Sequence, residues 1–405
     1  MSECRVCGGP VREFFDFGRQ PLSDAFLVPG DTDGEFFFRL AVGTCGSCAM
    51  VQLAEPAPRE LMFRHDYPYR SSQSARMNAH FARTARRLLD TLPSGGDPFV
   101  VEIGCNDGGL LAAMDAAGVR CLGVDPSVLA AKAAIDRGLR VRTEFFEAAS
   151  ASDIRATEGP ADLIYSANTI SHIPDLESVF GGVDRLLARD GRFVFEDPYL
   201  GDLLASSAFD QVIDEHFYFF TVRSLGAAAR RFGFELVDVE PLPVHGGQIR
   251  YTVARPGAHR PSPAVAETLA REDALDLTGE SSLRRFAANV ERIRADLLAL
   301  LRRLRAEGRR VAGYGATAKS ATVLNYCGIG PDLVEFVCDS TPAKQGRLTP
   351  GSHLPVRSPA EFADPYPDYA VLFAWNHAEE IMAKESAFRE AGGRWIRYVP
   401  DVHVV

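Results

Sequence analysis

The sequence predicts an α/β protein in which a cysteine-rich N-terminal module precedes two units built on parallel sheets. Two Cys-x-x-Cys pairs lie before residue 50. Apolar strands alternate with helices from residue 99 onward, and the same strand–turn–helix pattern begins again at residue 310 after a long helix. Strands that alternate with helices are typical of a parallel sheet that helices cover on both faces.

The N-terminal module carries a metal-binding pattern. Its two pairs consist of Cys4, Cys7, Cys45 and Cys48. Each pair places two thiolates on one tight turn, and two such turns complete a tetrahedral zinc site. The interval between the pairs is longer than in a usual zinc ribbon, so we expect further structure there. Four protein ligands leave no open position, so we predict structural Zn²⁺ rather than a catalytic metal.

The first α/β unit is expected to begin with a helix at 75–92. The strands and helices that follow are predicted from apolar runs and helical periodicity. Strands are expected at 99–103, 121–125, 161–166 and 192–196, and helices at 110–117 and 128–137. Antiparallel strands around 234–239 and 247–254 are expected to complete the unit.

A glycine turn follows the first of these strands and opens a helix. It contains Glu102, Gly104, Asn106 and Gly108. Asn106 stands where a dinucleotide site has its middle glycine, and a dinucleotide needs pyrophosphate to pack on the helix N-terminus. The pattern therefore favours a ligand with a ribose and an aminoacyl end but no phosphate. It resembles the first motif of class I S-adenosylmethionine methyltransferases.

Two polar residues complete the predicted cofactor site. Asp125 ends the next strand, where a carboxylate can accept hydrogen bonds from both ribose hydroxyls. Asn168 follows the strand that ends at Ser166, the place of the fourth-strand motif in the same fold. We therefore expect S-adenosylmethionine to bind between these residues and the glycine turn.

The second α/β unit carries a competing glycine motif. A helix is expected at about 280–307, then strands at 310–313 and 333–339. The run from Gly313 through Gly315 to Ala318 matches Gly-x-Gly-x-x-Ala, and Asp339 ends the next strand. This supports an alternative, an NAD-dependent oxidoreductase. With Lys319 directly after it, the turn could equally hold the phosphates of a nucleotide-linked substrate.

A third pattern carries titratable groups among aromatic residues. Asp214, Glu215 and His216 are followed at once by an aromatic run. Burial there would lower the pKa of His216 and keep its imidazole neutral, as a general base must be. The alternative is a hydrogen-bonded core histidine. His172 follows the Asn168 loop, close to any bound methyl donor, although by itself it could equally be structural.

Composition and charge limit the partners. Hydrophobic residues make up 46% of the chain, enough for more than one core, and the net charge is −10. A nucleic-acid partner would favour a basic face, so we expect none. No apolar run is long enough to span a bilayer, and the N-terminus lacks signal-peptide architecture. We expect a cytoplasmic protein without a membrane partner, a monomer or weak homodimer.

The order of the motifs resembles one family over nearly the whole chain. Two Cys-x-x-Cys pairs, a methyltransferase core, the Asp-Glu-His run, His245-Gly246-Gly247, the Gly313 turn and Trp375-Asn376 occur in sequence. This is similar to the deoxysugar C-methyltransferases of natural-product pathways. The resemblance implies methylation, at C3, of a dTDP-linked 4-keto-deoxysugar through an enolate made by a base.

The resemblance also implies roles for particular residues. His216 would be the base, Glu215 and His172 would shape the pocket, and Tyr67 would close over the reaction centre. The C-terminal unit would bind the nucleotide-linked keto-sugar through Gly313, Gly315, Lys319, Trp375 and Asn376.

The chain departs from the family pattern just before Asp-Glu-His. Comparable members carry a tyrosine there, whereas this chain has Ile213, which cannot hydrogen-bond an enolate. Tyr218 or Tyr67 would then supply that contact, or the methylated carbon would be C5. A non-catalytic sugar-nucleotide binding protein is a further alternative.

The combined prediction is a chain of three domains. Residues 1–74 form a zinc-binding module, and residues 75–256 form a class I methyltransferase Rossmann-like domain that binds S-adenosylmethionine. Residues 257–405 form a second Rossmann-like α/β domain that binds the sugar nucleotide.

Overall fold

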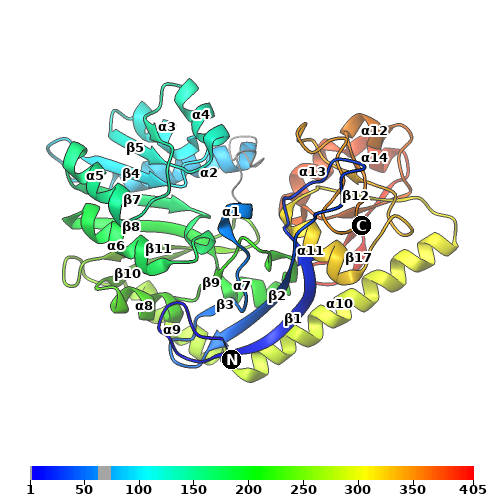
Figure 1. Ribbon diagram of the computed structural model, residues 1–405, viewed down its shortest axis with the longest axis horizontal. Coiled ribbons are helices and arrows are strands. Elements are labelled where there is room, and N and C mark those ends of the chain that lie inside the picture. The colour runs from blue at the N-terminus through cyan, green and yellow to red at the C-terminus, as the bar shows by residue number, and fades with distance from the viewer. Residues whose placement is uncertain (1, 63–73) are drawn as a thin grey trace.

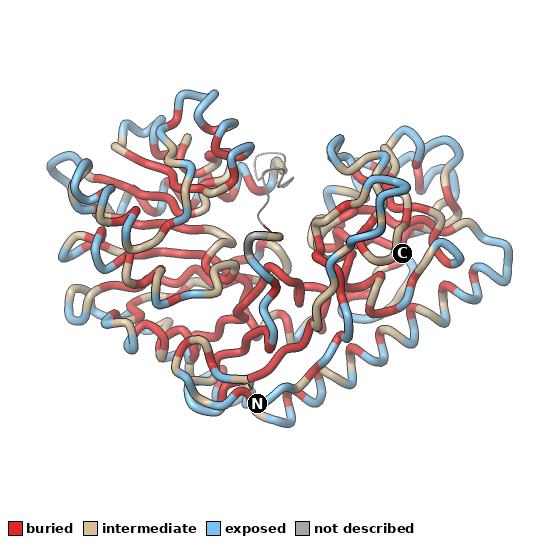
Figure 2. The backbone as a smooth tube through the Cα atoms, viewed as in Figure 1, coloured by how far each residue is buried: buried red, intermediate tan, exposed pale blue. Residues whose placement is uncertain are grey.

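The computed structural model describes residues 2–62 and 74–405. Two lobes stand side by side, and an N-terminal sheet and the long helix α10 (Glu280–Ala306) connect them at one end (Figure 1). Buried backbone runs through both lobes and through the connecting sheet (Figure 2). Within the described ranges, no helix is both long and apolar enough to cross a lipid bilayer.

The N-terminal module is a four-stranded antiparallel sheet in the order β1-β2-β3-β9. The first three strands come from the start of the chain and the fourth from its middle: β1 (Val11–Pro21), β2 (Phe37–Cys45), β3 (Val51–Leu53) and β9 (Tyr218–Phe219). Strands β1 and β2 fill the interval between the two cysteine pairs, as the sequence predicts. A short helix, α1 (Arg59–Met62), follows β3.

The first lobe contains a seven-stranded sheet in the order β10-β11-β8-β7-β4-β5-β6. Its parallel strands are β4 (Phe99–Ile103), β5 (Arg120–Val124), β6 (Val141–Arg142), β7 (Ala161–Ala167) and β8 (Leu187–Pro198). Beyond β8, strand β11 (Gln248–Ala254) pairs antiparallel with β8, and β10 (Glu235–Leu242) pairs antiparallel with β11 at the edge. This arrangement confirms the predicted class I methyltransferase fold.

Helices cover both faces of this sheet, which explains why its strands are almost continuously apolar. Phe99 and Val101 of β4 face one apolar cluster, while Val100 between them faces another. The surrounding helices are α2 (Ala75–Leu89), α3 (Gly109–Ala116), α4 (Val128–Asp136), α5 (Ala148–Glu158), α6 (Leu176–Leu186), α7 (Leu200–Ser206), α8 (Val222–Arg231) and α9 (Pro263–Ala274). Two short 3₁₀ turns, η2 (Ile170–His172) and η3 (Phe209–Gln211), lie beside the site described below.

The second lobe has a six-stranded sheet in the order β14-β13-β12-β15-β16-β17. The strands are β12 (Val311–Tyr314), β13 (Val337–Cys338), β14 (Val356–Arg357), β15 (Tyr369–Leu372), β16 (Arg394–Arg397) and the antiparallel β17 (His403–Val404). The helices are α11 (Ala318–Cys327), α12 (Pro359–Ala363), α13 (Ala378–Lys384) and α14 (Ser386–Glu390), with the 3₁₀ turn η4 (Trp375–His377). The predicted second α/β domain is confirmed.

Helix α10 packs an apolar stripe inward. Leu283, Phe286, Val290 and the residues that continue the stripe are buried. Phe286 lies 6.3 Å from Phe15 of β1, ring centre to ring centre, so the helix also rests on the N-terminal sheet. Arginines on its other face form ion pairs within the helix, such as Arg292 with Asp296. This charged face is therefore turned to solvent.

The structure departs from the predicted boundaries at several points. Strand β13 has only two residues, because a turn occupies 331–333 where the predicted strand begins. The predicted domain limits, at residues 74/75 and 256/257, stay predictions.

Candidate active site

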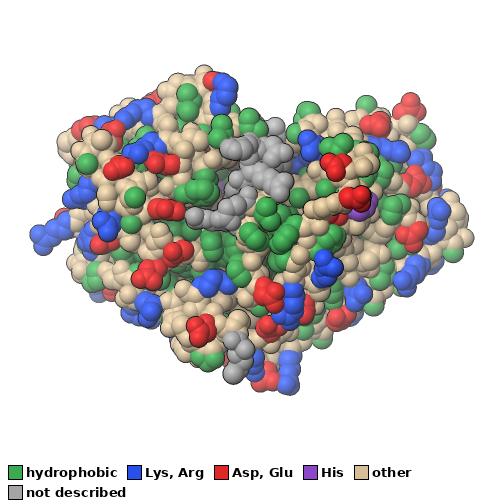
Figure 3. All heavy atoms as spheres, viewed as in Figure 1, with side chains coloured by type: hydrophobic (Ala, Val, Ile, Leu, Met, Phe, Trp, Pro, Cys, Tyr) green, Lys and Arg blue, Asp and Glu red, His purple; other side chains and the backbone are tan. Residues whose placement is uncertain are grey.

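A cavity of about 690 Å³ lies where the two lobes and the N-terminal module meet. The molecular surface is hollowed between the lobes, and apolar side chains gather beside the hollow (Figure 3). Residues from all three parts of the chain line the cavity, including Asp24, Glu102, Asp125, Asn168, His216 and Lys319. Its volume suits one or two small molecules, since ligand sites measure about 300–1,000 Å³.

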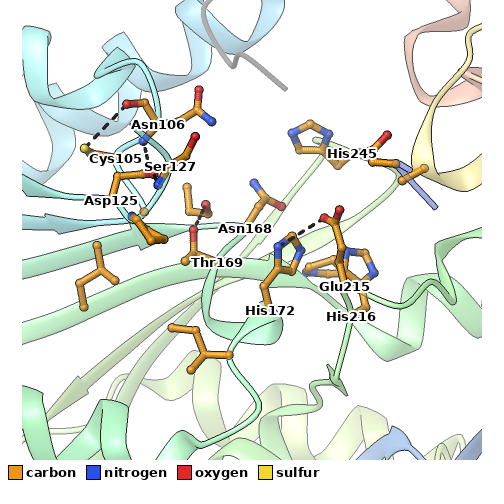
Figure 4. A pocket seen from close by; sticks show the side chains of 18 of the residues that line it. Cys105, Asn106, Asp125, Ser127, Asn168, Thr169, His172, Glu215, His216 and His245 are labelled. Carbon is orange, nitrogen blue, oxygen red and sulfur yellow. Dashed lines mark hydrogen bonds and ion pairs between the residues drawn. The ribbon is translucent and has the colours of Figure 1, made fainter. Parts of the chain in front are cut away.

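The predicted cofactor turn forms one wall of the cavity. The backbone amide of Asn106 donates to Asp125 Oδ2 at 2.7 Å, and the amide of Ser127 donates to Asp125 Oδ1 at 2.8 Å. Gly104 has φ of +68°, and a Cβ at this position would lie 2.2 Å from Thr169 Oγ1. The turn therefore requires glycine, and Asp125 ties the ends of β4 and β5 together (Figure 4).

The two ends of this turn and a neighbouring loop complete the predicted cofactor site. Glu102 lines the cavity, and burial raises the pKa of its carboxyl well above the usual value. Gly108 has φ of +80° and begins α3, close to Leu139, although it does not itself line the cavity. Asn168, on the neighbouring loop, also has positive φ and accepts a hydrogen bond from Gln248. The predicted cofactor residues thus come together at the carboxyl edge of the sheet.

His216 lies on another wall of the same cavity (Figure 4). Its Nδ1 is 2.7 Å from the carbonyl oxygen of Gln211. Because a carbonyl can only accept, Nδ1 carries the hydrogen and Nε2 keeps its lone pair. Burial lowers the pKa of His216 to about 4, and the charge of Lys319 adds to this effect. The imidazole is therefore neutral near pH 7, as the sequence predicts for a base.

His172 and Glu215 stand next to His216. The rings of His172 and His216 are 5.0 Å apart, and His172 Nδ1 is 3.7 Å from Glu215 Oε2. Burial, and then the neighbouring His216, lowers the pKa of His172 well below the ordinary value. Both residues line the cavity, which agrees with their predicted place at the pocket.

The N-terminal module holds the segment that carries His216. The amide of Ser23 donates to Asp214 Oδ1 at 3.0 Å, and the amide of Leu53 donates to the carbonyl of Phe217 at 3.1 Å. Arg5, which lies between two of the cysteines, donates from Nη2 to the same Phe217 carbonyl at 3.2 Å. The Asp-Glu-His motif is therefore positioned by the metal-binding module as well as by the first lobe.

The C-terminal wall contains only some of the residues predicted for substrate binding. Lys319 and Asn376 line the cavity, whereas Gly313, Gly315 and Trp375 lie behind its surface. The indole nitrogen of Trp375 donates to Asp210 Oδ2 at 2.6 Å and so joins the two lobes.

The structure describes only one of the two tyrosines that could supply a hydrogen bond to the enolate oxygen. Tyr67 lies outside the described residues. Tyr218 is buried in β9, does not line the cavity, and donates its hydroxyl to the carbonyl of Pro174 at 2.5 Å. Ile213 does line the cavity, but its side chain offers no hydrogen-bond donor.

Two histidines that the sequence analysis did not assign to the site, His245 and His377, also line the cavity. The rings of His245 and His377 lie 6.1 Å apart, one from each lobe. Burial lowers the pKa of His245 to about 3. Both histidines lie beside sequence motifs, the two glycines after His245 and the Trp-Asn pair before His377. Only the folded chain brings the two imidazole rings together.

The four N-terminal cysteines form a candidate metal centre. Cys4 Sγ lies 3.6 Å from Cys48 Sγ and Cys7 Sγ lies 3.4 Å from Cys45 Sγ, with all four sulfurs within 4.8 Å of one another. A tetrahedral ion with Zn–S bonds of about 2.3 Å needs sulfurs about 3.8 Å apart. Backbone amides of Val6 and Ser47 also point to two of the sulfurs. The donor set and spacing fit zinc.

Three family models match successive parts of the chain. A "zinc binding domain" matches residues 4–63, a "Methyltransferase domain" matches 74–239 and a "C-methyltransferase C-terminal domain" matches 243–400.

Individual relatives were also found. The C-methyltransferase NovU of Streptomyces niveus is 38% identical over 100% of this chain and 97% of its own length. Sarcosine/dimethylglycine N-methyltransferase of Halorhodospira halochloris is 29% identical over 26% of this chain and 40% of its own. The solved magnesium protoporphyrin IX methyltransferase of Synechocystis PCC 6803 is 14% identical, covering 44% of this chain and 79% of its own, with a TM-score of 0.33.

Proposed function

The chain belongs to the S-adenosylmethionine-dependent C-methyltransferases, and on this premise we propose that it methylates C3 of a dTDP-linked 4-keto-deoxysugar. The enzyme class, the cofactor and the zinc-binding module follow from the full-length relative and the three domain matches. The sugar, its nucleotide and the methylated carbon are proposals, as is a place in antibiotic sugar biosynthesis.

One observation carries the proposal: a neutral imidazole and the cofactor turn line a single cavity. Glu102, Asn106, Asp125 and Asn168 would hold the cofactor, which supplies an electrophilic methyl group when bound. His216 Nε2 has a free lone pair because Nδ1 is committed to Gln211. A lone pair at this place can remove a proton from a substrate carbon.

The reaction requires the protein to hold the two reactants close together and to supply a base. A keto group at C4 acidifies the hydrogen on the neighbouring carbon. His216 takes that hydrogen as a proton, and the electron pair left behind forms the new carbon–carbon bond with the methyl group. Glu215 and His172 shape the pocket around the base. The lobes hold donor and acceptor together, which removes much of the entropic part of the barrier.

C5 is the alternative carbon, because it also neighbours the C4 keto group. Methylation at C5 is retained as an alternative because of Ile213. This residue lines the cavity, whereas comparable family members carry a tyrosine at the same place in the motif. Carbons C3 and C5 lie on opposite sides of the carbonyl. A changed set of donors could therefore select either orientation of the sugar.

The test uses the zinc-loaded protein, methyl-¹³C-labelled S-adenosylmethionine and a panel of dTDP-linked keto-sugars. We expect one labelled methyl group on a ring carbon, which carbon-13 NMR would locate at C3. A methyl group at C5 would replace the C3 proposal. A label found on oxygen or nitrogen, or no transfer to any keto-sugar, would overturn the proposed substrate class.

A further inference from the structure

Among the residues that the structure describes, a half-buried lysine on the C-terminal wall of the cavity forms no ion pair. Lys319 lies in the first turn of α11 and lines the cavity. Its Nζ is enclosed by protein and makes no hydrogen bond within residues 2–62 and 74–405. The Trp375 ring lies 5.1 Å from Nζ. Burial lowers the pKa of Lys319, and the charge of Asp210 opposes this. An enclosed ammonium without a hydrogen-bond partner is unfavourable, so its place in the cavity wall points to a ligand that would supply one.

The neighbouring acid does not neutralise Lys319 through contact. Asp210 is the acid whose charge acts on the lysine, but its Oδ2 accepts hydrogen bonds from Trp375 and Tyr398 at 2.6 Å each. The other lysine of the cavity is Lys344. Its Nζ donates to the carbonyl of Ala316 at 2.8 Å and lies 3.4 Å from an Asp24 oxygen. Among the described lysines of this wall, Lys319 alone keeps its donors unused.

The charge of Lys319 acts on the part of the cavity that holds the base. It contributes to the lowered pKa of His216, of His245 and of His377, after burial in each case. A base with a pKa of about 4 removes a proton weakly from a carbon next to a ketone. Deprotonation then depends on a group that stabilises the negative charge which develops on the keto oxygen.

We propose that Lys319 is a catalytic residue that donates a hydrogen bond to the keto oxygen and stabilises the enolate. This inference rests on the proposed function. In the first step the carbon–hydrogen bond breaks, the proton moves to His216 Nε2, and the electron pair forms a carbon–carbon double bond as the keto oxygen becomes negative. In the second step that double bond attacks the methyl group, the carbonyl re-forms, and S-adenosylhomocysteine leaves.

The sugar diphosphate is the other anion that could meet this ammonium. A diphosphate carries its charge permanently and is strongly hydrated, whereas Lys319 offers a single ammonium with no hydrogen-bond partner among the described residues. A single preorganised donor in a water-poor site suits a charge that appears only during reaction.

The test follows enolate formation without methyl transfer. The zinc-loaded chain is mixed in D₂O with dTDP-4-keto-6-deoxyglucose and S-adenosylhomocysteine, and proton NMR records loss of the signals next to the ketone. We expect the wild-type chain to exchange one such hydrogen. Lys319→Met should slow this exchange by about 10²–10³, the usual effect of losing one oxyanion donor. Exchange in Lys319→Met within threefold of wild type would overturn the inference.

Calorimetric titration with dTDP alone separates the enolate from the diphosphate. The Kd of Lys319→Met should stay within about threefold of the wild-type value. A Kd weakened by about 30-fold or more would place the ammonium on the diphosphate and overturn the inference. His216→Asn should also abolish exchange. If it exchanges at the wild-type rate with Lys319 intact, the lysine would itself be the base, and the electrophilic role would be wrong.

Folding and the proposed function have their own controls. Removing an unpaired buried charge should leave Tm unchanged or raise it, and Lys319→Gln gives a second neutral variant if Met lowers it. Exposed Lys384→Met, in the same lobe, controls for net charge and should exchange normally.

A wild-type chain that neither exchanges nor methylates any keto-sugar would defeat the proposed function. Normal wild-type activity with normal exchange in Lys319→Met would defeat only the role of Lys319.

Discussion

The two Rossmann-like units use the same local device but make different use of it. In the first unit Asp125 accepts hydrogen bonds from the amides of Asn106 and Ser127. In the second, Asp339 accepts from the amides of Ala316 and Thr341, both at 2.8 Å. Each aspartate ends a strand and ties down the glycine turn of the strand beside it. As local structures the two turns are near equivalents.

Their surroundings differ. The turn of the first unit lines the cavity from Glu102 to Asn106, together with Asp125. In the second unit Gly313, Gly315 and Asp339 do not reach the cavity, and only the end of the motif, Thr317 and Ala318, lines it. A Cβ on Gly315 would lie 2.7 Å from the Cβ of Ala374. The ammonium of Lys344 donates a hydrogen bond to the carbonyl oxygen of Ala316. A glycine motif and a terminal aspartate therefore do not by themselves make a cofactor site, because open space beside the turn is also required.

The largest expected effect tests whether the chemistry belongs to the edge of the first sheet. His216→Gln should lower the rate of methyl transfer by about 10³, within the range for losing a general base. The affinity for S-adenosylhomocysteine should stay within about threefold. Steady-state kinetics and calorimetry measure the two quantities, and the exposed His403→Gln is the control. A His216→Gln variant with a normal rate would remove the base assignment.

Zinc removal tests the contribution of the module that joins the two units. Chelation should lower methyl transfer by about 100-fold, because metal binding and folding are coupled and this module anchors the segment with His216. Binding of S-adenosylhomocysteine should persist, since the first unit holds it. Metal analysis should find one zinc per chain, and its return should restore the rate. A chelated protein with full activity would contradict the anchoring role.

A pair of matched variants tests the comparison directly. Asp125→Asn should weaken S-adenosylhomocysteine binding by about 30-fold, because hydrogen bonds to a charged acceptor contribute about 1.5–3 kcal/mol. Asp339→Asn makes the same chemical change in the second unit and should alter that Kd less than threefold. Equal losses in both variants, at unchanged Tm, would show that the cofactor depends on the second turn as well.

A buried acid near the end of β8, Asp197, should affect stability. Burial raises the pKa of Asp197 to about 7, so the folded chain binds one extra proton between about pH 4 and pH 7. The free energy of unfolding should therefore fall as pH rises through this window. Asp197→Asn, which can still accept from Ser171, should stabilise the chain by about 1–2 kcal/mol at pH 8 and less at pH 5. Equal Tm changes at both pH values would contradict this.

The smallest effect concerns the acid side of the pH profile. His216 has a pKa of about 4, so protonation should disable the base only as pH falls through that value. The log of kcat/KM should show no loss from this group between pH 8 and pH 5.5. An exposed histidine would instead lose activity near pH 6.5. A limb near 6.5 that disappears in His216→Gln would show that burial does not hold the imidazole neutral.

Much of the cofactor and metal sites could be predicted because their residues are close in sequence. Glu102 to Gly108 form one turn, and each zinc pair is a single knuckle. The burial of His216, which lowers its pKa, was also predicted from its aromatic neighbours. The pairing of β9 with β3, and the contact of Arg5 with Phe217, could not be predicted, since they join distant segments. The same is true of His245 and His377, which meet only across the two lobes.

The sequence by itself determined the local pieces: the four thiolates, the glycine turns, the strand–helix alternation and the apolar stripe of α10. These depend on periodicity and on backbone conformations that near neighbours in sequence decide. Only the tertiary structure decided which of two similar turns exposes its glycine to the cavity and which predicted residues lie behind its wall. It also decided that Lys319 has no hydrogen-bond partner among the described residues. Those properties depend on long-range packing, because empty space and missing partners are set by every segment that surrounds a residue.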